Sequence, residues 1–457
     1  MTAAIEPAGK VFVLAPDSSG SSVLATNGHH GPLALPFNVV AGELTTPTVV
    51  AAVEACVGAR APVLRIDTYF RDDDGADAHV ALVEIEPMEA PAPEGLTFAD
   101  LTPQTIASME PALLREPLAG WLERQRTGPS PGQAPWSQPG WFARASAWMV
   151  EEMARVGAPA KDPPRLHHMW LQSAILRADS AHDAHFLKCS APVFRAEAVL
   201  TAALAAVTSD LVTPVVSVEP AEGWLLMRDH GSQLVGQMPV ADWVRGLEAY
   251  GDLQRAWSER GSTLIEIGVP IRSLGALADA VPGMADHPLT SPHLTDADRA
   301  AWHAATPSLI AACRRLDALG PPATLVHGDL HPWNIVVQDG RYRVIDWPGA
   351  ALGHPFVDLA LYLFQMDDHD TRRHLRDAYL IGWSGVIDGA ALAEAGELAL
   401  TVGCLDQALL ARNFRAALEP ADPRQMNPFD AQMLRRALAV LTAGIDYVKP
   451  KPARPAP

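Results

Sequence analysis

Near the N-terminus, three short apolar runs have the length and β-branched content of strands: 10–15, 62–66 and 79–85. Among them, an Ala- and Val-rich segment predicts a helix over 48–57 that ends at Gly58. Beyond residue 231, apolar positions recur every three or four residues, as from Trp243 to Trp257, which is typical of helices with one buried face. The pattern predicts an α+β fold, in which a small N-terminal domain precedes a helical C-terminal part.

Strand and helix patterns alternate in the middle of the chain. An apolar run ends at Lys188, and the Ala-rich, Leu-spaced segment that follows predicts a helix with Glu197 near its start. A short buried strand then ends at Met227, and the polar residues 228–231, which include Asp229, interrupt it. This order predicts a strand-rich lobe that a hinge joins to the helical part.

These patterns, with the Gly and Pro content, divide the chain into five expected segments: an α+β N-terminal domain at 1–125, a linker with a Trp-containing helix at 126–160, a strand-rich lobe at 161–230, a helical lobe at 231–448 and a disordered tail at 449–457. The linker is marked by dense Gly and Pro at 128–135. Beyond it, Trp141 and Trp148 are seven residues apart and share one helical face. That face predicts a packed interdomain helix, with a sugar-stacking platform as the alternative.

One polar block carries recognisable chemistry, because residues 327–334 read His-Gly-Asp-Leu-His-Pro-Trp-Asn. Its His327, Asp329 and Asn334 match the kinase catalytic-loop pattern His-x-Asp-Leu-x-x-x-Asn. In that pattern the Asp accepts the proton of a substrate hydroxyl and the Asn binds magnesium. The alternative interpretation is a buried His and a polar turn before a hairpin.

A second carboxylate is expected beside this block. Two β-rich runs surround Asp339-Gly340 and predict a hairpin. The hairpin would return Asp346 to a position beside Asn334. Kinases hold magnesium with a carboxylate at the corresponding place. Two carboxylates and an amide at these spacings can hold a hydroxyl nucleophile and magnesium against a nucleoside triphosphate.

Residues 327–360 resemble the aminoglycoside phosphotransferase family, the small-molecule branch of the protein-kinase-like fold. The likeness is carried by the catalytic block, by Ile345-Asp346-Trp347 and by a Gly-x-Pro-x-x-Asp-Leu-Ala block at 353–360. It implies a bilobal fold, with a β-rich lobe before a helical one, and ATP and Mg²⁺ as cofactors.

The resemblance also implies roles for single residues. Asp329 would be the catalytic base, and Asn334 and Asp346 would bind magnesium. His327 and Asp358 would hold the catalytic loop as structural residues. These five side chains make up the expected phosphotransfer site.

Upstream of that site, the resemblance implies a nucleotide site. Lys188 would contact the α- and β-phosphates and pair with Glu197, while the hinge at Met227 and Asp229 would meet adenine. The alternatives are a solvated strand end for Lys188 and a helix-dipole role for Glu197. The turn before Lys188, at 177–183, contains no Gly, whereas kinases cover the phosphates with a Gly-rich loop. This departure leaves a non-catalytic, kinase-fold scaffold as an alternative function.

In the resembled family, helices after the metal-binding Asp form the acceptor pocket, and the candidate carboxylates here are Asp367, Asp368, Asp406 and Glu419. Asp367 belongs to an acidic run that is alternatively a solvated helix end. Asp406 lies in an apolar helix, where a buried charge needs a partner. Pairing with Arg412 or Arg415 of the same helix is the alternative to a contact with substrate.

Composition narrows the expected partners. The net charge of −18 repels nucleic acid and anionic membranes, and it favours a cationic acceptor. We therefore expect a small molecule with a free hydroxyl, such as an aminoglycoside-like or amino-sugar compound, with a simple sugar metabolite as the alternative. Four scattered Cys residues argue against a disulfide framework or a zinc site. The chain shows neither a leader-like start nor about 18 consecutive apolar residues, so we expect a cytoplasmic protein.

The N-terminal domain carries a second, fainter resemblance. A strand, the Gly42-Glu43 turn and the following helix are similar to a Nudix domain. Nudix helices bind metal through Arg-Glu and Glu-Glu pairs, whereas the helix here offers Glu54 among Ala and Val. We therefore expect no hydrolase activity from this domain, and a role as a cap or scaffold.

Overall fold

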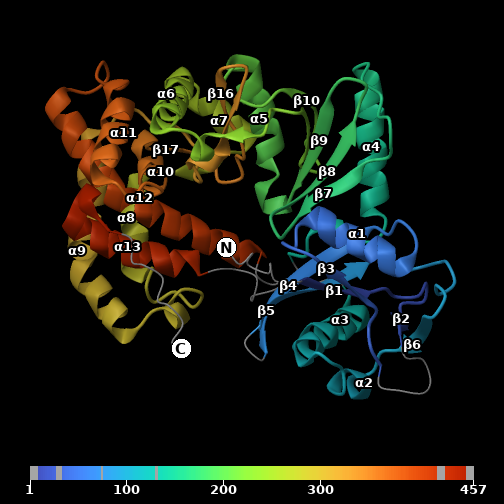
Figure 1. Cartoon of the computed structure of the whole chain (residues 1–457). Helices are drawn as coiled ribbons and strands as arrows, with labels where there is room; N and C mark the ends of the chain where they lie inside the picture. The colour runs from blue at the N-terminus through green and yellow to red at the C-terminus, as the bar shows by residue number, and fades with distance from the viewer. Residues whose placement is uncertain (1–8, 27–32, 74–75, 129–131, 419–427, 449–457) are drawn as a thin grey trace, which may run out of the picture. The chain divides into compact units, whose positions relative to one another are not determined.

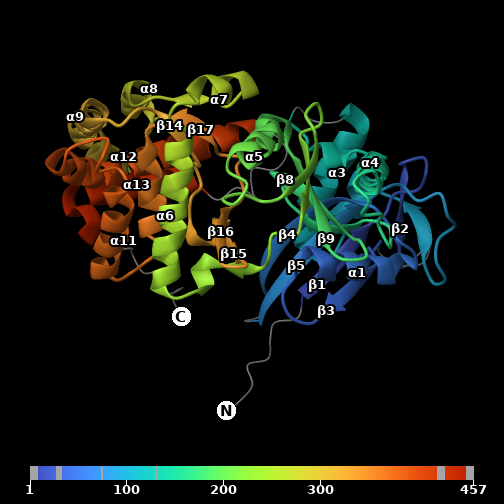
Figure 2. The same cartoon turned by 90° about the horizontal axis from the view of Figure 1, so that it is seen from above.

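The computed structural model describes residues 9–26, 33–73, 76–128, 132–418 and 428–448 (Figures 1 and 2). The chain forms two compact units, which divide between Pro192 and Val193. Leu418 belongs to the first unit, and the described residues from 428 onward belong to the second. Within the described ranges, no helix is long and apolar enough to span a bilayer. The expected α+β class is confirmed, while the finer division into five segments stays a prediction.

The first unit begins with a four-stranded sheet whose strand order is β3-β1-β5-β4. Its strands are β1 (Gly9–Leu14), β3 (Phe37–Val40), β4 (Val63–Asp73) and β5 (Ala76–Ile85). The central pair β1–β5 is parallel and the two outer pairs are antiparallel. Helices α1 (Thr46–Val57) and α3 (Arg115–Thr127) lie on opposite faces of the sheet (Figure 1). The helix predicted at 48–57 is confirmed and begins earlier, because Thr45 caps its first turn.

The remaining elements of this unit are β2 (Ser22–Ala25), β6 (Thr97–Asp100), α2 (Pro103–Ala107), η1 (Ala112–Leu114), η2 (Pro135–Ser137), α4 (Trp141–Arg155), β7 (Arg165–Met169), β8 (Ser173–Asp179) and β9 (Ala184–Ser190). Strands β7, β8 and β9 form an antiparallel meander. The Trp-containing helix is confirmed as α4, where Trp141 is fully buried and Trp148 is half-buried. Part of the expected linker, 129–131, the acceptor-site candidate Glu419 and the expected tail, 449–457, lie outside the described residues.

The second unit is mainly helical. Its helices are α5 (Ala196–Val207), α6 (Val240–Trp257), α7 (Gly261–Ile267), α8 (Leu274–Ala280), α9 (Asp296–Leu319), α10 (Leu359–Leu363), α11 (His369–Ile381), α12 (Gly389–Leu418) and α13 (Phe429–Ala443). Its strands are β10 (Val215–Glu219), β11 (Trp224–Arg228), β12 (Gln233–Leu234), β13 (Ile271–Arg272), β14 (Thr324–Val326), β15 (Ile335–Gln338), β16 (Arg341–Val344) and β17 (Ala351–Gly353). Short 3-10 turns, among them η7 (Pro332–Asn334) and η8 (Pro355–Asp358), join several of these elements.

Helix α6 anchors the core of this unit and runs beside the β15–β16 hairpin (Figure 2). The predicted stripe is confirmed, because every member is buried: Trp243, Leu247, Tyr250, Leu253 and Trp257. The hairpin is confirmed as well, since its two turn residues, Asp339 and Gly340, have φ of 53° and 72°, as a twisted two-residue turn requires. Strand β14 leads into the catalytic block, and β15 leaves it, so two small sheets fix both ends of the block.

Candidate active site

His327 is the buried centre of the catalytic block. Its Nε2 lies 2.9 Å from the carbonyl oxygen of Ile345, and its Nδ1 accepts from the amide of Asp329 at 3.2 Å. Since Nδ1 accepts, Nε2 carries the proton and donates it to Ile345. The ring also packs against Trp347, with centroids 4.5 Å apart. One side chain therefore ties the loop that carries Asp329 to the segment that carries Asp346.

A hydrogen bond to the same loop fixes the orientation of the Asn334 side-chain amide. Its Nδ2 donates to the backbone oxygen of Asp329 at 2.9 Å, which leaves Oδ1 as the atom that can bind a cation. The Asp329 carboxylate is half-exposed, and its Oδ2 lies 3.8 Å from Nε2 of His331. Burial lowers the pKa of His331 to about 4, so at neutral pH this ring approaches Asp329 uncharged.

The hairpin returns the chain to Asn334, whose carbonyl oxygen accepts from the amide of Ile345 at 3.0 Å. The next residue, Asp346, is exposed and has a φ of 69°, a left-handed conformation that is uncommon for any residue other than Gly. Backbone strain of this kind concentrates at functional sites. Oδ1 of Asn334 and the Asp346 carboxylate are hard oxygen donors of the type that magnesium prefers.

These two donors suit magnesium, which protein sites usually bind through one or two carboxylates together with substrate phosphates and water. A cage of protein ligands is accordingly not required. Within the ranges that the structure describes, no group of three or more His, Cys, Asp or Glu side chains is arranged to hold a metal.

Asp358 lies beneath the loop and is almost fully buried. Its two oxygens accept from the amides of His327 and Gly328 at 2.8 and 3.0 Å, and Oδ2 also accepts from the hydroxyl of Tyr250. Burial raises the pKa of Asp358, and these donors act in the opposite direction. Burial and the neighbouring Asp358 charge raise the pKa of Tyr250 well above its ordinary value, so the phenol keeps its proton and donates it. Gln254 extends the network by donating to Tyr250 at 2.9 Å.

The nucleotide candidates lie in both units. In the second unit, buried Glu197 accepts from the amide of Trp347 at 2.9 Å, which links α5 to the residue after Asp346. Lys188 is buried on β9 of the first unit, and its pairing with Glu197 stays a prediction.

Met227 is buried on β11 and packs with Ala198 and Leu225. Asp229 is exposed and accepts from the amide of Gly231 at 2.9 Å, as in a polar turn. Contact of the Met227–Asp229 segment with adenine stays a prediction.

The β8–β9 turn differs from a phosphate-binding loop. The hydroxyl of Ser180 donates to the carbonyl oxygen of Asp183 at 2.9 Å and accepts from the amides of His182 and Asp183. These groups are therefore engaged inside the turn, and the sequence had left open whether they contact phosphate.

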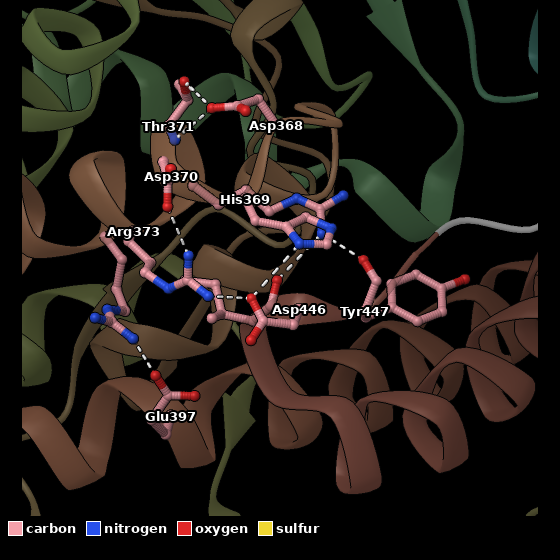
Figure 3. A network of polar contacts seen from close by, with 11 residues as sticks. Asp368, His369, Asp370, Thr371, Arg373, Glu397, Asp446 and Tyr447 are labelled. Carbon is pink, nitrogen blue, oxygen red and sulfur yellow. Dashed lines mark hydrogen bonds and ion pairs between the residues drawn. The ribbon is translucent and has the colours of Figure 1, made fainter.

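The acidic run before α11 caps that helix. Asp367 is exposed in the preceding loop, and Asp368 accepts from the amide and hydroxyl of Thr371 (Figure 3). Figure 3 also shows Arg373 between Asp370 and Asp446, to both of which it is paired. These contacts agree with the solvated helix end that the sequence allowed.

Asp406 is buried on α12 and pairs with Arg272 of β13, with 3.1 Å between Oδ1 and Nε. The alternative prediction, that Asp406 pairs with Arg412 or Arg415 of its own helix, is wrong. A residue six or nine positions along a helix lies on a different face, so neither side chain reaches Asp406. Arg415 instead pairs with Asp430 at 2.6 Å.

Two positioning contacts of the site escaped the sequence analysis. Gln407 donates to the carbonyl oxygen of Gly328 at 2.6 Å, and Nη1 of Arg272 donates to that of Gly349 at 2.6 Å. The polar pair Asp406-Gln407 inside an apolar helix was a signal for the first contact. No sequence feature near Arg272 indicates its contact with Gly349.

Residues 225–398 match the phosphotransferase enzyme family. A comparison with curated proteins gives no match. Among solved structures, a choline/ethanolamine kinase family protein from Mesorhizobium loti is 18% identical over 66% of this chain and 100% of its own, with a TM-score of 0.45. A macrolide 2'-phosphotransferase from Brachybacterium faecium is 19% identical over 61% and 98%, with a TM-score of 0.42. An aminoglycoside phosphotransferase in complex with ADP and hygromycin B is 16% identical over 65% and 97%, also at 0.42.

These structural likenesses are distant, and the assignment rests on the family match. The matched residues include the catalytic block, the hairpin and Asp346. The match to the phosphotransferase enzyme family thus covers the segment that carries the candidate site, and it supports a phosphotransferase that acts on hydroxyl groups.

Proposed function

We propose that the chain transfers the γ-phosphoryl group of ATP, with Mg²⁺, to a hydroxyl of a small molecule. The proposal is carried by one observation: a single set of hydrogen bonds connects the backbone segments that hold Asp329, Asn334 and Asp346. His327 connects the Asp329 loop to Ile345, and Asn334 is bonded to both segments. Asp329, Asn334 and Asp346 therefore act as one preorganised group.

In the proposed reaction the acceptor hydroxyl gives its proton to the Asp329 carboxylate. The hydroxyl oxygen forms a bond to the γ-phosphorus, the bond from that phosphorus to the β,γ-bridging oxygen breaks, and ADP leaves. Asn334 and Asp346 would hold magnesium, which neutralises phosphate charge when it is bound. Most of the rate enhancement comes from positioning, since the transition state of phosphoryl transfer is loose. Lys188 would contact the phosphates from the first unit.

The acceptor that we propose is an aminoglycoside-like or amino-sugar compound. Support comes from the acidic net charge and from Asp406, whose Oδ2 has no hydrogen-bond partner among the described residues. A sugar without an amine is the second candidate, because a hydroxyl can donate to the same oxygen. A non-catalytic scaffold would bind nucleotide or acceptor without turnover.

The test is transfer of labelled phosphate from [γ-³²P]ATP to a panel of aminoglycosides, amino sugars, neutral sugars and amino alcohols, with and without Mg²⁺. The proposal expects labelled product with at least one class, dependent on Mg²⁺ and on Asp329. Labelled product that forms equally well with Asp329→Asn would refute the assigned role of Asp329. Nucleotide binding without transfer to any acceptor would favour the scaffold.

A further inference from the structure

A pocket of about 460 Å³ opens in the second unit beside the catalytic loop. It lies among the start of α5, the β13–α8 segment, residues 347–350 and α12. This volume is within the usual range for small-molecule sites. The pocket is separate from the helix-end network of Figure 3, none of whose labelled residues lines it.

The floor of the pocket is polar and joins the catalytic loop. Arg272, which lines the pocket, donates to Gly349, and the Gly349 carbonyl oxygen lies 2.2 Å from the place where a Cβ on Gly328 would be. Gln407, next to the pocket residue Asp406, donates to Gly328. The residue after Gly328 is Asp329, so a molecule seated on this floor is next to the loop that carries the proposed base.

Two polar atoms on the floor of the pocket, one hydrogen-bond donor and one acceptor, are available to bind a ligand. Nη2 of Arg272 and Oδ2 of Asp406 are buried, and neither has a hydrogen-bond partner in the described part of the chain. Asp406 is only 4% exposed, so an unpartnered oxygen there is costly unless a ligand supplies a donor. Because Arg272 already balances the Asp406 charge, this floor suits a neutral or singly charged polar group better than a polycation.

The walls of the pocket are apolar. Leu409, Leu410 and Phe414 face it from α12. Two further apolar side chains that line it are exposed, Ile271 at 60% and Val193 at 51%. Exposed apolar side chains that gather around a cavity mark a ligand site more strongly than scattered ones do.

We infer that this pocket holds the apolar body of an amphiphilic acceptor, which offers a hydroxyl or amine to Asp406 and a second hydroxyl to the catalytic loop. Within the proposed aminoglycoside-like and amino-sugar class, the pocket thus narrows the acceptor to a sugar or amino sugar that is linked to an apolar group. This inference rests on the proposed phosphotransfer. It adds that affinity grows with the apolar surface of the acceptor.

Alkyl β-D-glucosides with methyl, butyl, hexyl and octyl chains test the inference, because they share every hydroxyl and differ in the apolar group alone. Binding to the full chain is measured by calorimetry below the micelle concentration, and phosphate transfer is measured in parallel. Each methylene that enters the pocket should strengthen binding by up to about fourfold. Flat affinity from methyl to octyl would overturn the inference.

Two matched variants locate the effect. Ile271→Ser removes an exposed Ile from the pocket edge, and Ile381→Ser removes an Ile that is 70% exposed on α11, away from the pocket. We expect Ile271→Ser to weaken octyl glucoside binding at least fivefold and to leave methyl glucoside unchanged, while Ile381→Ser changes neither. Equal effects of the two variants would contradict the inference, because they would indicate non-specific adsorption.

The experiments distinguish a failure of the proposed phosphotransfer from a failure of the apolar pocket. Transfer without a dependence on chain length would keep the phosphotransferase and reject the apolar pocket. Binding that depends on chain length and on Ile271, without transfer to any acceptor, would keep the pocket and reject the proposed reaction.

Discussion

Substitution of Gly328 by Ala tests how tightly the catalytic loop is held. Gly328 has a φ of +81°, and a Cβ there would lie 2.2 Å from the Gly349 carbonyl oxygen. Side-chain carbons essentially never come within 3.0 Å of such an atom, so the two segments must separate by at least about 0.8 Å. That movement acts directly on the backbone next to Asp329.

The cost has two parts. The left-handed conformation costs an Ala about 1 kcal/mol relative to Gly. Separation also strains the hydrogen bond from Arg272 to Gly349, and a bond with a charged donor is worth about 1.5–3 kcal/mol. We therefore expect Gly328→Ala to reduce the free energy of unfolding by about 2.5–4 kcal/mol. A displacement of about 1 Å at the loop should lower kcat/KM by about 100-fold.

Gly340→Ala is the matched control. Gly340 has a φ of +72°, and a Cβ there would meet nothing within 4 Å. It therefore carries the conformational cost of about 1 kcal/mol without the collision. Urea unfolding gives the stability difference, and phosphate transfer gives kcat/KM. Equal losses of stability in the two variants, or near-normal turnover by Gly328→Ala, would refute the close contact between the loop and Gly349.

Three further predictions address other groups. Asp346→Asn should weaken the affinity for Mg²⁺ and ATP at least tenfold, because a magnesium ligand loses its charge; a nucleotide titration with unchanged affinity would remove Asp346 from the metal site. Tyr250→Phe should reduce the free energy of unfolding by about 1–2 kcal/mol, since Asp358 loses one of three donors, and a urea midpoint equal to wild type would contradict this. Burial lowers the pKa of the His354 side chain from 6.5 to about 4. As the pH drops, the unfolded chain therefore takes up a proton at this ring before the folded chain does. The free energy of unfolding should fall between about pH 6.5 and about pH 4, by up to about 1.4 kcal/mol per pH unit. His354→Asn should flatten that slope, whereas the exposed His303→Asn should not, and equal slopes in unfolding curves would exclude His354 as the cause.

Local features of the fold were predictable from the sequence. The Asp339-Gly340 turn and the stripe on α6 each depend on residues close in sequence, so their periodicity and turn chemistry suffice. The capping residues set helix starts that periodicity missed. Helix α1 begins at Thr46 because Thr45 caps it, whereas the apolar pattern placed its start at residue 48.

The supports of the site were less accessible, because they come from distant parts of the chain. Gln407 reaches Gly328 across 79 positions, and Arg272 reaches Asp406 across 134. Sequence reasoning gave Asp406 partners on its own helix, since only local spacing was visible. The catalytic block itself was predictable, because its residues are neighbours in sequence and their spacing can be read directly.

The central claim is that Asp329 accepts the proton of the acceptor hydroxyl. It is tested most directly by comparing turnover and ATP affinity in Asp329→Asn with those in Asp339→Asn, which makes the same change in the exposed hairpin turn. The account predicts that Asp329→Asn loses at least about 100-fold in kcat, as removal of a general base does, and that it keeps its affinity for ATP. Asp339→Asn should match wild type in both. Near-normal kcat in Asp329→Asn would contradict the account.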